Sequence, residues 1–504
     1  MSLASIPVPA SAPQQSVTSQ PLSLLHRLFS ASTLFCCLLA AIVYMCVPQT
    51  FADPDIDWHL RDAQILLRTH HMITHDLFSF TAAGAPWMNH EWLAELPFYA
   101  AWRFGGTTGV HALTLIVIEG LMFGIYGLSV ARSRDLRLSL IVSVSATILS
   151  TVSFGPRTLL FGWLLLLAEL AILQRALARP RTVWLLPALF AVWVNTHGSW
   201  MIGLVIYAVF VVTNAVRYES PWLISAGLAG PQLRTYISCG FASIAALFFN
   251  PYGWRLVAYP FNLAFHQKLN IANVEEWHTL DFQTPRGKFA LLCVVAVALW
   301  QLVRPRRWRL ADMALMLLGV YSGFTYSRFL FLFAILAAPI VAGTFATEAP
   351  GRARYRWPLL NAACIAFVAA LVFNRMHHPE TVDPRAGNPL PQALPAALAA
   401  LPPGSRVLNE YTLGGVLILR QPQVPVFIDS RVDIFEYDGA LKDYLDIIHL
   451  HGTLDLLNRY GITHVLFEPD TPLVYFLEHT GSWDVIHRDN ELVLLKRRKE
   501  AGLR

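Results

Sequence analysis

Four ionisable residues occupy alternate positions in the stretch FADPDIDWHL, residues 51–60. Asp53, Asp55 and Asp57 come first, and His59 continues the spacing. Carboxylates in an Asp-x-Asp pattern can supply oxygen ligands to Mg²⁺ or Mn²⁺, or one can act as a general base while a neighbour orients it. A helix cap or a solvated turn explains any one of the three acids about equally well. The spacing alone therefore leaves metal binding, proton transfer and a structural role open.

Five later motifs, WMNHEW, NTHGSW, NPYGWR, VEEWH and TYSR, carry polar groups that could complete such a site. A turn that ends an apolar segment explains Asn250 and Tyr252 more simply than a binding role does, and an aromatic belt explains Trp277. Arg328 opens an apolar segment, where a cation must find an anion or reach the surface, and it could hold a phosphate group. The candidates from these motifs are His90, Glu91, His197, Asn250, Tyr252, Glu276, Trp277 and Arg328.

Long apolar segments must position these motifs, because 55% of the 504 residues are hydrophobic and only 14% are charged. Soluble domains carry about 25% charged residues, so the composition predicts a polytopic α-helical membrane protein, and its apolar windows predict about eleven transmembrane helices. The apolar windows lie near residues 28–49, 108–130, 136–154, 158–175, 182–195, 199–216, 235–249, 288–303, 311–325, 328–346 and 357–373.

Arginine clusters predict the orientation of this bundle. They follow the second, fourth, eighth and tenth windows, at residues 132–137, 175–181, 304–309 and 352–356. The positive-inside rule assigns these even-numbered loops to the cytoplasm, which places the N-terminus inside and the C-terminal region outside. The Asp-rich stretch and the five later motifs then all fall on the external side. The net charge of +5 comes from the Arg clusters and requires no nucleic-acid partner.

The chain divides into four predicted parts. Residues 1–24 are expected to form a disordered cytoplasmic tail. Residues 25–373 form the transmembrane domain, which includes a first external loop at 49–107. A Pro-rich linker at 374–404 leads to a small periplasmic α/β domain at 405–504.

Alternating patterns in the last part predict its α/β character. The strand candidates are RVLNE, GGVLILR, VPVFIDS, THVLFEP, WDVIHRD and ELVLLKR, and helices are expected at residues 440–461 and 472–479. The most suggestive polar group there is Asp429-Ser430-Arg431. A strand-end turn with an internal ion pair explains these three residues more readily than a binding site does.

The Asp-rich stretch begins a longer segment, DPDIDWHLRDAQILLRTHHMITHDLFSFTAAGAPWMNHEWLAELPFYAAWRFGG, which resembles the first periplasmic loop of polytopic bacterial proteins with the GT-C glycosyltransferase architecture. These are relatives of the dolichyl-phosphate-mannose mannosyltransferase, aminoarabinose transferase and RgtA/B/C/D-like groups. WVNTHGSW, NPYGWRL, EEWHTLDF and GGVLILRQPQVPVFIDSRVDIF are similar to later stretches of one branch of such proteins. The resemblance covers most of the chain from about residue 25, and the order of the motifs is more specific than any one of them.

This resemblance implies an inverting transfer of a sugar from a polyprenyl-phosphate-linked donor to a glycan, lipid or protein acceptor outside the bacterial inner membrane. In GT-C enzymes an acid early in the first external loop is the usual catalytic base, often with a second acid later in that loop. Carried over by position, Asp55 is the expected base, Asp53 its partner and Glu91 the later acid. Asp57 ranks lower, because the related pattern more often has an aromatic residue there. The remaining polar candidates, His59 among them, would bind the substrates.

The chain departs from the better characterised GT-C groups in two motifs. Mannosyltransferases begin the loop with Asp-Glu, and many relatives carry a later stretch like His-Pro-Pro-Leu. Here the counterparts are Asp-Pro-Asp and His90-Glu91-Trp92. GT-C enzymes occur both with and without a catalytic ion, so Mg²⁺ or Mn²⁺ held by Asp53 and Asp55 stays an open alternative.

Two other classes of function compete with a transferase. One is a transporter or flippase for a lipid-linked glycan, and the other is a non-catalytic scaffold that binds such glycans. Transporters place ionisable residues near the bilayer midplane and repeat broken helices in two halves. This sequence shows no internal repeat, and its ionisable motifs gather outside the apolar windows. The pattern therefore favours the enzyme.

Overall fold

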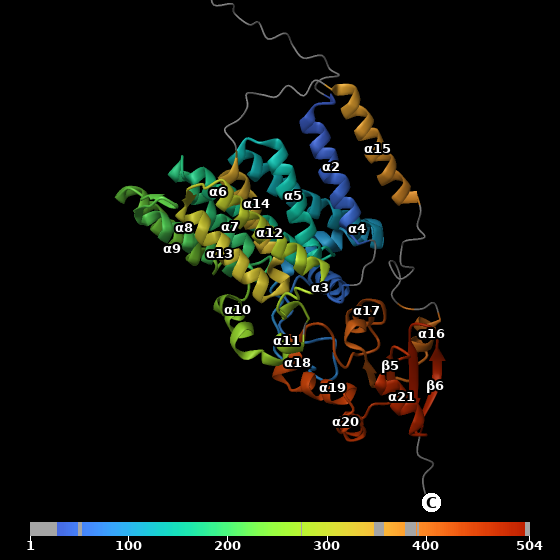
Figure 1. Ribbon diagram of the computed structural model, residues 1–504. Helices are drawn as coiled ribbons and strands as arrows, with labels where there is room; N and C mark the ends of the chain where they lie inside the picture. The colour runs from blue at the N-terminus through green and yellow to red at the C-terminus, as the bar shows by residue number, and fades with distance from the viewer. Residues whose placement is uncertain are drawn as a thin grey trace, which may run out of the picture.

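The computed structural model describes residues 28–48, 53–273, 275–346, 357–377, 390 and 393–498. The predicted tail, the Arg cluster at 352–356 and part of the predicted linker lie outside these residues. Helices form a bundle, and residues 393–498, called the C-terminal region below, lie under one end of it (Figure 1). The domain boundaries given above stay predictions.

A helix lies at each of the eleven positions where an apolar window predicted one. Among the described residues, six helical segments are long and apolar enough to cross a membrane, and they begin at Trp92, Leu136, Leu159, Pro285, Ser327 and Pro358. The remaining helices of the bundle are shorter, so the count of eleven spans stays a prediction. The helices are α2 (Ala31–Cys46), α4 (Trp92–Ser133), α5 (Leu136–Ser150), α6 (Leu159–Ala176), α7 (Leu186–Trp193), α8 (Trp200–Ala215), α9 (Gly230–Ala246), α12 (Pro285–Val303), α13 (Leu310–Thr325), α14 (Leu330–Phe345) and α15 (Pro358–His377).

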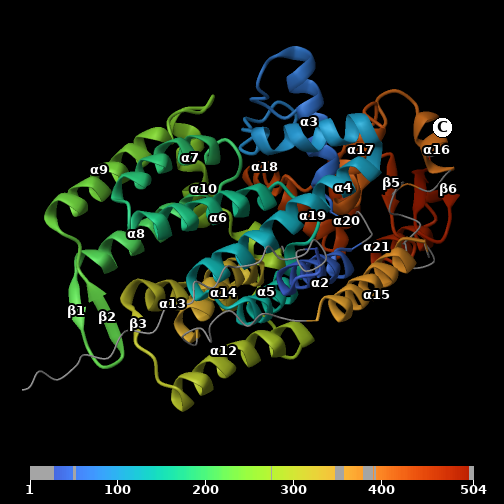
Figure 2. The ribbon, with the colours of Figure 1, turned by 90° about the horizontal axis from the view of Figure 1, so that it is seen from above.

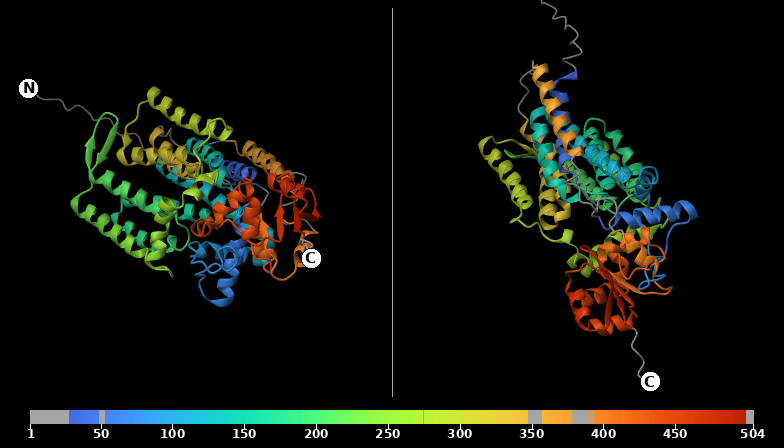
Figure 3. Two further views of the ribbon diagram at one scale, coloured as in Figure 1. Left: turned by 90° about the horizontal axis from the view of Figure 1, so that it is seen from below. Right: turned by 90° about the vertical axis from the view of Figure 1, so that its right-hand side faces the viewer.

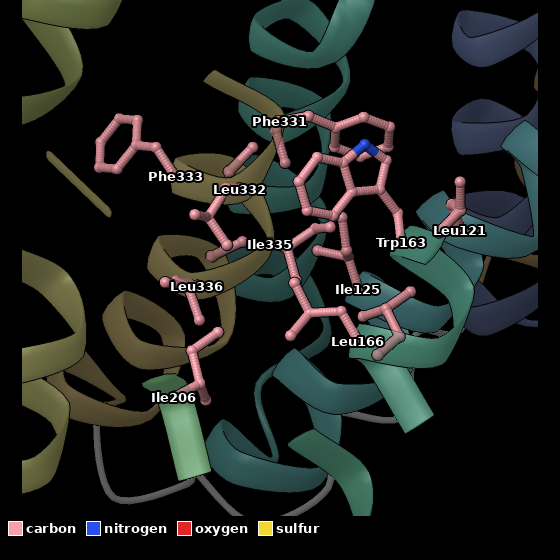
Figure 4. Packing of buried hydrophobic residues seen from close by; sticks show 14 of the residues in the cluster. Leu121, Ile125, Trp163, Leu166, Ile206, Phe331, Leu332, Phe333, Ile335 and Leu336 are labelled. Atoms are coloured by element: carbon pink, nitrogen blue, oxygen red, sulfur yellow. The ribbon is translucent and has the colours of Figure 1, made fainter. Parts of the chain in front are cut away.

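The core of the bundle surrounds α14, whose sequence LFLFAILAAPIVAGTF is apolar on every side. A helix of this kind must be covered all round, and α14 packs against α4, α5 and α13. Its Phe331 meets Trp163 of α6 with ring centroids 5.7 Å apart (Figure 4). The short 3₁₀-helix η4 (Ser327–Phe329) directly precedes α14, so this core also fixes the position of Arg328.

The predicted first external loop is largely helical. Its first helix is α3 (Ile56–Thr69), and α4 contributes the segment before Gly106, where a φ of 57° and a ψ of −146° break the helix. Asp55 is the N-cap residue of α3, and Glu91 is the N-cap residue of α4. Neither side chain makes a capping hydrogen bond. Both carboxylates are thus held on rigid backbone and left free for other contacts.

Short elements cover both ends of the bundle. At the end of α8 far from His197, β1 (Arg217–Glu219), β2 (Leu223–Ala226) and β3 (Trp308–Arg309) form a sheet in that order (Figure 2). At the other end, α3 lies between the bundle and the C-terminal region (Figures 1 and 3). It is joined there by α10 (Trp254–His266), α11 (Lys268–Asn273) and η3 (Glu275–Trp277).

The C-terminal region is a four-stranded sheet with helices, in the strand order β4-β5-β7-β6. β4 pairs in parallel with β5, and the other pairs are antiparallel. The strands are β4 (Val407–Asn409), β5 (His464–Phe467), β6 (Trp483–Arg488) and β7 (Val493–Arg497). The helical elements are α16 (Leu394–Ala399), η7 (Tyr411–Leu413), α17 (Gly414–Arg420), α18 (Val432–Tyr437), α19 (Ala440–Ile448), α20 (Thr453–Arg459) and α21 (Pro472–His479).

Four of the six predicted strands are confirmed, and two are wrong. GGVLILR forms α17, because a short apolar run fits a buried helix as well as a buried strand. VPVFIDS is no strand of the sheet, because its backbone pairs with the first loop instead. Val426 donates from its N–H to the Phe78 carbonyl at 3.1 Å and accepts from the Phe80 N–H at 3.0 Å.

The first loop and the C-terminal region share one hydrophobic core. Trp58, Ile73 and Trp87 belong to the same buried cluster as Phe427 and the strands of the sheet. α17 comes so close to the first loop that a Cβ added at Gly415 would lie 2.4 Å from the Pro54 carbonyl oxygen. The absence of a side chain at Gly415 thus permits this backbone approach.

Gly415→Ala is expected to lower the free energy of unfolding by about 1–3 kcal/mol, the usual effect of overpacking a well-packed contact. The measurement is the thermal unfolding midpoint of the purified protein in detergent. Gly120→Ala is the control, because a Cβ there meets nothing within 4 Å. Equal midpoints for the two variants would show that the two segments do not pack this closely.

Candidate active site

One cavity of about 590 Å³ lies between the bundle and the C-terminal region. Its lining includes Asp55, Glu91, His197 and Arg328, which come from four separate polar motifs of the sequence. His59, His90, Glu276 and Trp277 line it as well. Eight of the predicted site residues therefore meet in a single space.

Asp55 reaches this cavity from the start of α3. Its Oδ1 accepts a hydrogen bond from the Trp58 indole N–H at 3.4 Å. Burial, followed by the charge of Asp53, raises the pKa of Asp55 to about 6, although His59, Ser430 and Arg157 oppose the shift. A carboxyl with this pKa is ionised at neutral pH and is still basic enough to take a proton.

Asp53 is buried behind Asp55 and is paired with Arg157. Its Oδ2 accepts from Arg157 Nε at 2.6 Å, and its Oδ1 accepts from the Asp55 backbone N–H at 3.0 Å. The same guanidinium pairs with Glu276. Burial alone would lower the pKa of Arg157, but Asp53 and Glu276 raise it, so this residue is a fixed positive charge.

The acids of the possible metal site already make hydrogen bonds. Both oxygens of Asp53 accept hydrogen bonds, and Arg157 pairs with both Asp53 and Glu276. Within the described ranges of the chain, no group of three or more His, Cys, Asp or Glu side chains is arranged to hold a metal ion. Mg²⁺ or Mn²⁺ at Asp53 and Asp55 stays a prediction.

Glu91 lies at the centre of three imidazoles. Its oxygens are 3.3 Å from His59 Nε2, 3.3 Å from His90 Nε2 and 3.1 Å from His197 Nε2. Burial would raise the pKa of Glu91, but these histidines, His90 first, hold it well below its usual range. The hydroxyl of Thr158 also donates to Glu91 Oε2 at 2.7 Å.

The histidines around Glu91 differ in their own protonation. The carboxylate of Glu91 raises the pKa of His90, which outweighs the effect of its burial. Burial lowers the pKa of His197 to about 4, so this ring is neutral at neutral pH. His59 is held from behind, because its Nδ1 lies 2.8 Å from Glu95 Oε1. Glu91 and His90 thus lie in contact in the cavity wall, each favouring the charged form of the other, with a neutral ring beside them.

Arg328 lines the cavity from η4, directly before α14. Its guanidinium lies over the Trp277 ring, 4.3 Å from the centroid, and no salt bridge to it is recorded among the residues that the structure describes. It lines the same space as Asp55. Glu276 is the acid whose charge acts most strongly on Arg328. An Arg that lines a cavity is suited to an anionic ligand such as a phosphate.

Three predicted residues do not line the cavity. Asn250 holds a turn, since its Nδ2 donates to the carbonyls of Leu247 and Gly253 at 2.8 and 3.0 Å. The Tyr252 hydroxyl donates to the Ile73 carbonyl at 2.9 Å. Asn250 also accepts from the Tyr252 backbone N–H at 2.8 Å, so both residues belong to the turn, while Asp53 lies behind Asp55. Substrate binding by these residues stays a prediction.

Several lining residues were not predicted. Arg157 follows α5 in a segment that the topology placed outside, where an Arg away from the cytoplasmic clusters was a usable signal. The C-terminal region adds Asp433, together with Ser430 and Arg431 from the polar group that the sequence had singled out and whose internal ion pair is present. Asp433 Oδ2 accepts from the Tyr259 hydroxyl at 3.1 Å, and the Tyr259 ring lies 4.4 Å from that of His90. Nothing in the sequence pairs residues so far apart.

No protein-family model matches the chain, and no curated protein matches it in sequence. Solved structures do resemble it. ArnT from Cupriavidus metallidurans, bound to undecaprenyl phosphate, has a TM-score of 0.54 at 15% identity, over 94% of this chain and 99% of that one. The oligosaccharyltransferase AglB from Archaeoglobus fulgidus, with an inhibitory peptide and a dolichol-phosphate, has a TM-score of 0.51 at 12% identity, over 87% of this chain and 69% of that one. The predicted GT-C resemblance is confirmed at the level of the fold.

Proposed function

We propose that this protein is an inverting glycosyltransferase, which moves a sugar from a polyprenyl-phosphate-linked donor to an acceptor hydroxyl at the external face of a bacterial inner membrane. The observation that carries the proposal is the convergence of Asp55 and Arg328 on one cavity beside the membrane-spanning helices. A base and a phosphate-binding cation are the two groups that such a transfer needs.

The reaction is a displacement at the anomeric carbon. Ionised Asp55 accepts the proton of the acceptor hydroxyl as the new glycosidic bond forms. The bond from the anomeric carbon to the phosphate oxygen breaks, and its electron pair leaves with the polyprenyl phosphate. That leaving group is already a stable anion, so no general acid is required. Arg328 and the fixed charge of Arg157 offset its negative charge.

Two features of the similar structures support the lipid part of the proposal. The ArnT structure holds undecaprenyl phosphate, and the AglB structure holds a dolichol-phosphate. The donor sugar and the acceptor are left open at the level of a glycan, lipid or protein. We infer from the Arg clusters that the cavity end of the bundle faces outward.

Turnover tests the proposal directly. The purified protein in nanodiscs is incubated with a panel of undecaprenyl-phosphate sugars and a membrane extract as the acceptor source. Release of undecaprenyl phosphate is measured, because this product does not depend on which acceptor is used. A flippase would move the donor across the bilayer without releasing the phosphate, and a scaffold would bind the donor and release nothing.

Arg328→Gln is expected to weaken the binding of undecaprenyl phosphate by about tenfold or more, because a hydrogen-bonded charge on the phosphate is lost. Binding is measured as the concentration of undecaprenyl phosphate that half-saturates the thermal shift of the protein in detergent. Arg255→Gln is the matched control, since Arg255 is exposed near the same end of the bundle and does not line the cavity. If both variants are half-saturated at the same concentration of undecaprenyl phosphate, Arg328 does not bind the phosphate.

A further inference from the structure

The C-terminal region reaches the candidate base at a single turn, residues 429–431. This turn follows the segment that pairs with the first loop and precedes α18. Ser430 and Arg431 both line the cavity. The contacts of these two residues show what the region does there.

Arg431 fixes the turn to the first loop. Its side chain is only 3% exposed and pairs with Asp429 of its own turn at 2.7 Å and with Asp76 of the first loop at 2.6 Å. The guanidinium also lies 4.9 Å from the ring centroids of Phe78 and Trp87. Removing one partner of a buried pair leaves an uncompensated charge, so this contact has one stable geometry.

Ser430 is thereby placed against the residues around Asp55. Its Oγ accepts from the Trp58 indole N–H at 2.9 Å and donates to the Pro54 carbonyl at 3.2 Å. The Ser430 hydroxyl also acts to lower the pKa of Asp55, against the larger effect of burial. Trp58 therefore bridges Ser430 and Asp55, because its N–H also points to Asp55 Oδ1 at 3.4 Å.

We infer that Ser430 is a positioning residue for Asp55, so that the C-terminal region is a working part of the transfer site. This inference rests on the proposed function, because it assigns Ser430 a role only if Asp55 acts as the base. The Ser430 hydroxyl has one proton, and the Trp58 N–H occupies one of its lone pairs. The proton can therefore turn either to Asp55 or to the Pro54 carbonyl.

The two positions of that proton suit the two states of the base. When Asp55 is ionised, the hydroxyl donates to the carboxylate and favours the charged form. When Asp55 has taken the proton of the acceptor, the hydroxyl can turn to the Pro54 carbonyl at no loss of hydrogen bonds. Other groups also act on Asp55 electrostatically, and these are Asp53, His59, Arg157, Arg328 and Tyr411. All of them remain in place when the Ser430 hydroxyl is removed.

The test compares Ser430→Ala with Ser482→Ala, which removes an exposed hydroxyl of the same region away from the cavity. Release of undecaprenyl phosphate is measured against pH for both, using whichever undecaprenyl-phosphate sugar the wild type turns over. Ser430→Ala is expected to lower kcat about tenfold, the effect of losing one hydrogen bond to a charged group. It is also expected to move the acid limb of the profile to higher pH, while half-saturation by undecaprenyl phosphate stays unchanged. Ser482→Ala should match the wild type.

Ser430→Thr keeps the hydroxyl and is expected to keep the wild-type acid limb. An Ala variant with the wild-type limb and kcat would overturn the inference, and so would a Thr variant that behaves like the Ala variant. Asp55→Asn is measured alongside. If Asp55→Asn is inactive while Ser430→Ala behaves like the wild type, only the inference about Ser430 fails. If Asp55→Asn turns over at the wild-type rate, the proposed role of Asp55 as the base fails, and the inference fails with it.

Discussion

Asp55→Asn is expected to lower kcat/KM for release of undecaprenyl phosphate by about 10²- to 10⁴-fold, the usual contribution of a general base. The amide has the size of the carboxyl and can still accept the hydrogen bond from Trp58, so the local packing survives. It cannot take a proton from the acceptor. The thermal unfolding midpoint should therefore stay close to that of the wild type while turnover is lost.

Asp57→Asn is the matched control for this change. Asp57 lies two residues further along α3, does not line the cavity, and its nearest opposite charge is Arg420. Burial raises the pKa of Asp57 to about 6 as well, so the two acids are similar in ionisation and differ in position. The control is expected to keep most of the wild-type rate. Undiminished turnover in Asp55→Asn, or an equal loss in both variants, would remove Asp55 as the base.

The pKa of Asp55 predicts the direction in which kcat/KM changes with pH. A base works in its ionised form, so kcat/KM should rise with pH through about 6, the pKa of Asp55, and then level off. Residual turnover by Asp55→Asn should lack this acid limb. A limb that persists unchanged in the Asn variant would have to come from another group, such as His90 beside Glu91.

The sequence predicted those cavity-lining residues that could be located by counting the apolar windows. Asp55, Glu91 and His197 belong to polar motifs between apolar windows, so counting windows was enough to place them on one face. The same reasoning could not tell that Asn250 and Tyr252 hold a turn, because turn and binding motifs share residue types. Distinguishing the two needed the hydrogen-bond partners.

Contacts between distant segments were beyond prediction from one sequence. Ser430 and Pro54 are separated by 376 positions, and their hydrogen bond depends on a shared core that no local pattern encodes. GGVLILR was wrongly predicted as a strand for a local reason, since a short apolar run fits a buried helix equally well. Its glycines suit the approach of α17 to Pro54, which only the folded chain shows. The pairing of Asp53 with the guanidinium of Arg157, 104 positions away, is a contact of the same kind.

Arg157→Gln is expected to lower kcat/KM by about 10²- to 10³-fold, the range seen when one group of a preorganised electrostatic site is removed. Arg157 joins Asp53 to Glu276, so its loss leaves two carboxylates without their cation. Its charge also lowers the pKa of Asp55. Without it that pKa rises, and the acid limb of the profile should move to higher pH. The measurement is release of undecaprenyl phosphate against pH.

Arg157→Lys separates the two roles of the guanidinium. Lysine keeps the charge but is a single point, whereas the planar fork of arginine can pair with Asp53 and Glu276 together. The Lys variant is therefore expected to keep the wild-type acid limb and still lose part of kcat. Arg286→Gln, at an exposed position outside the cavity, should leave both unchanged. If Arg157→Lys has full wild-type activity, a positive charge at this position is sufficient. If Arg157→Lys shifts the acid limb as far as Arg157→Gln does, Arg157 influences Asp55 through the shape of the loop and not through its charge.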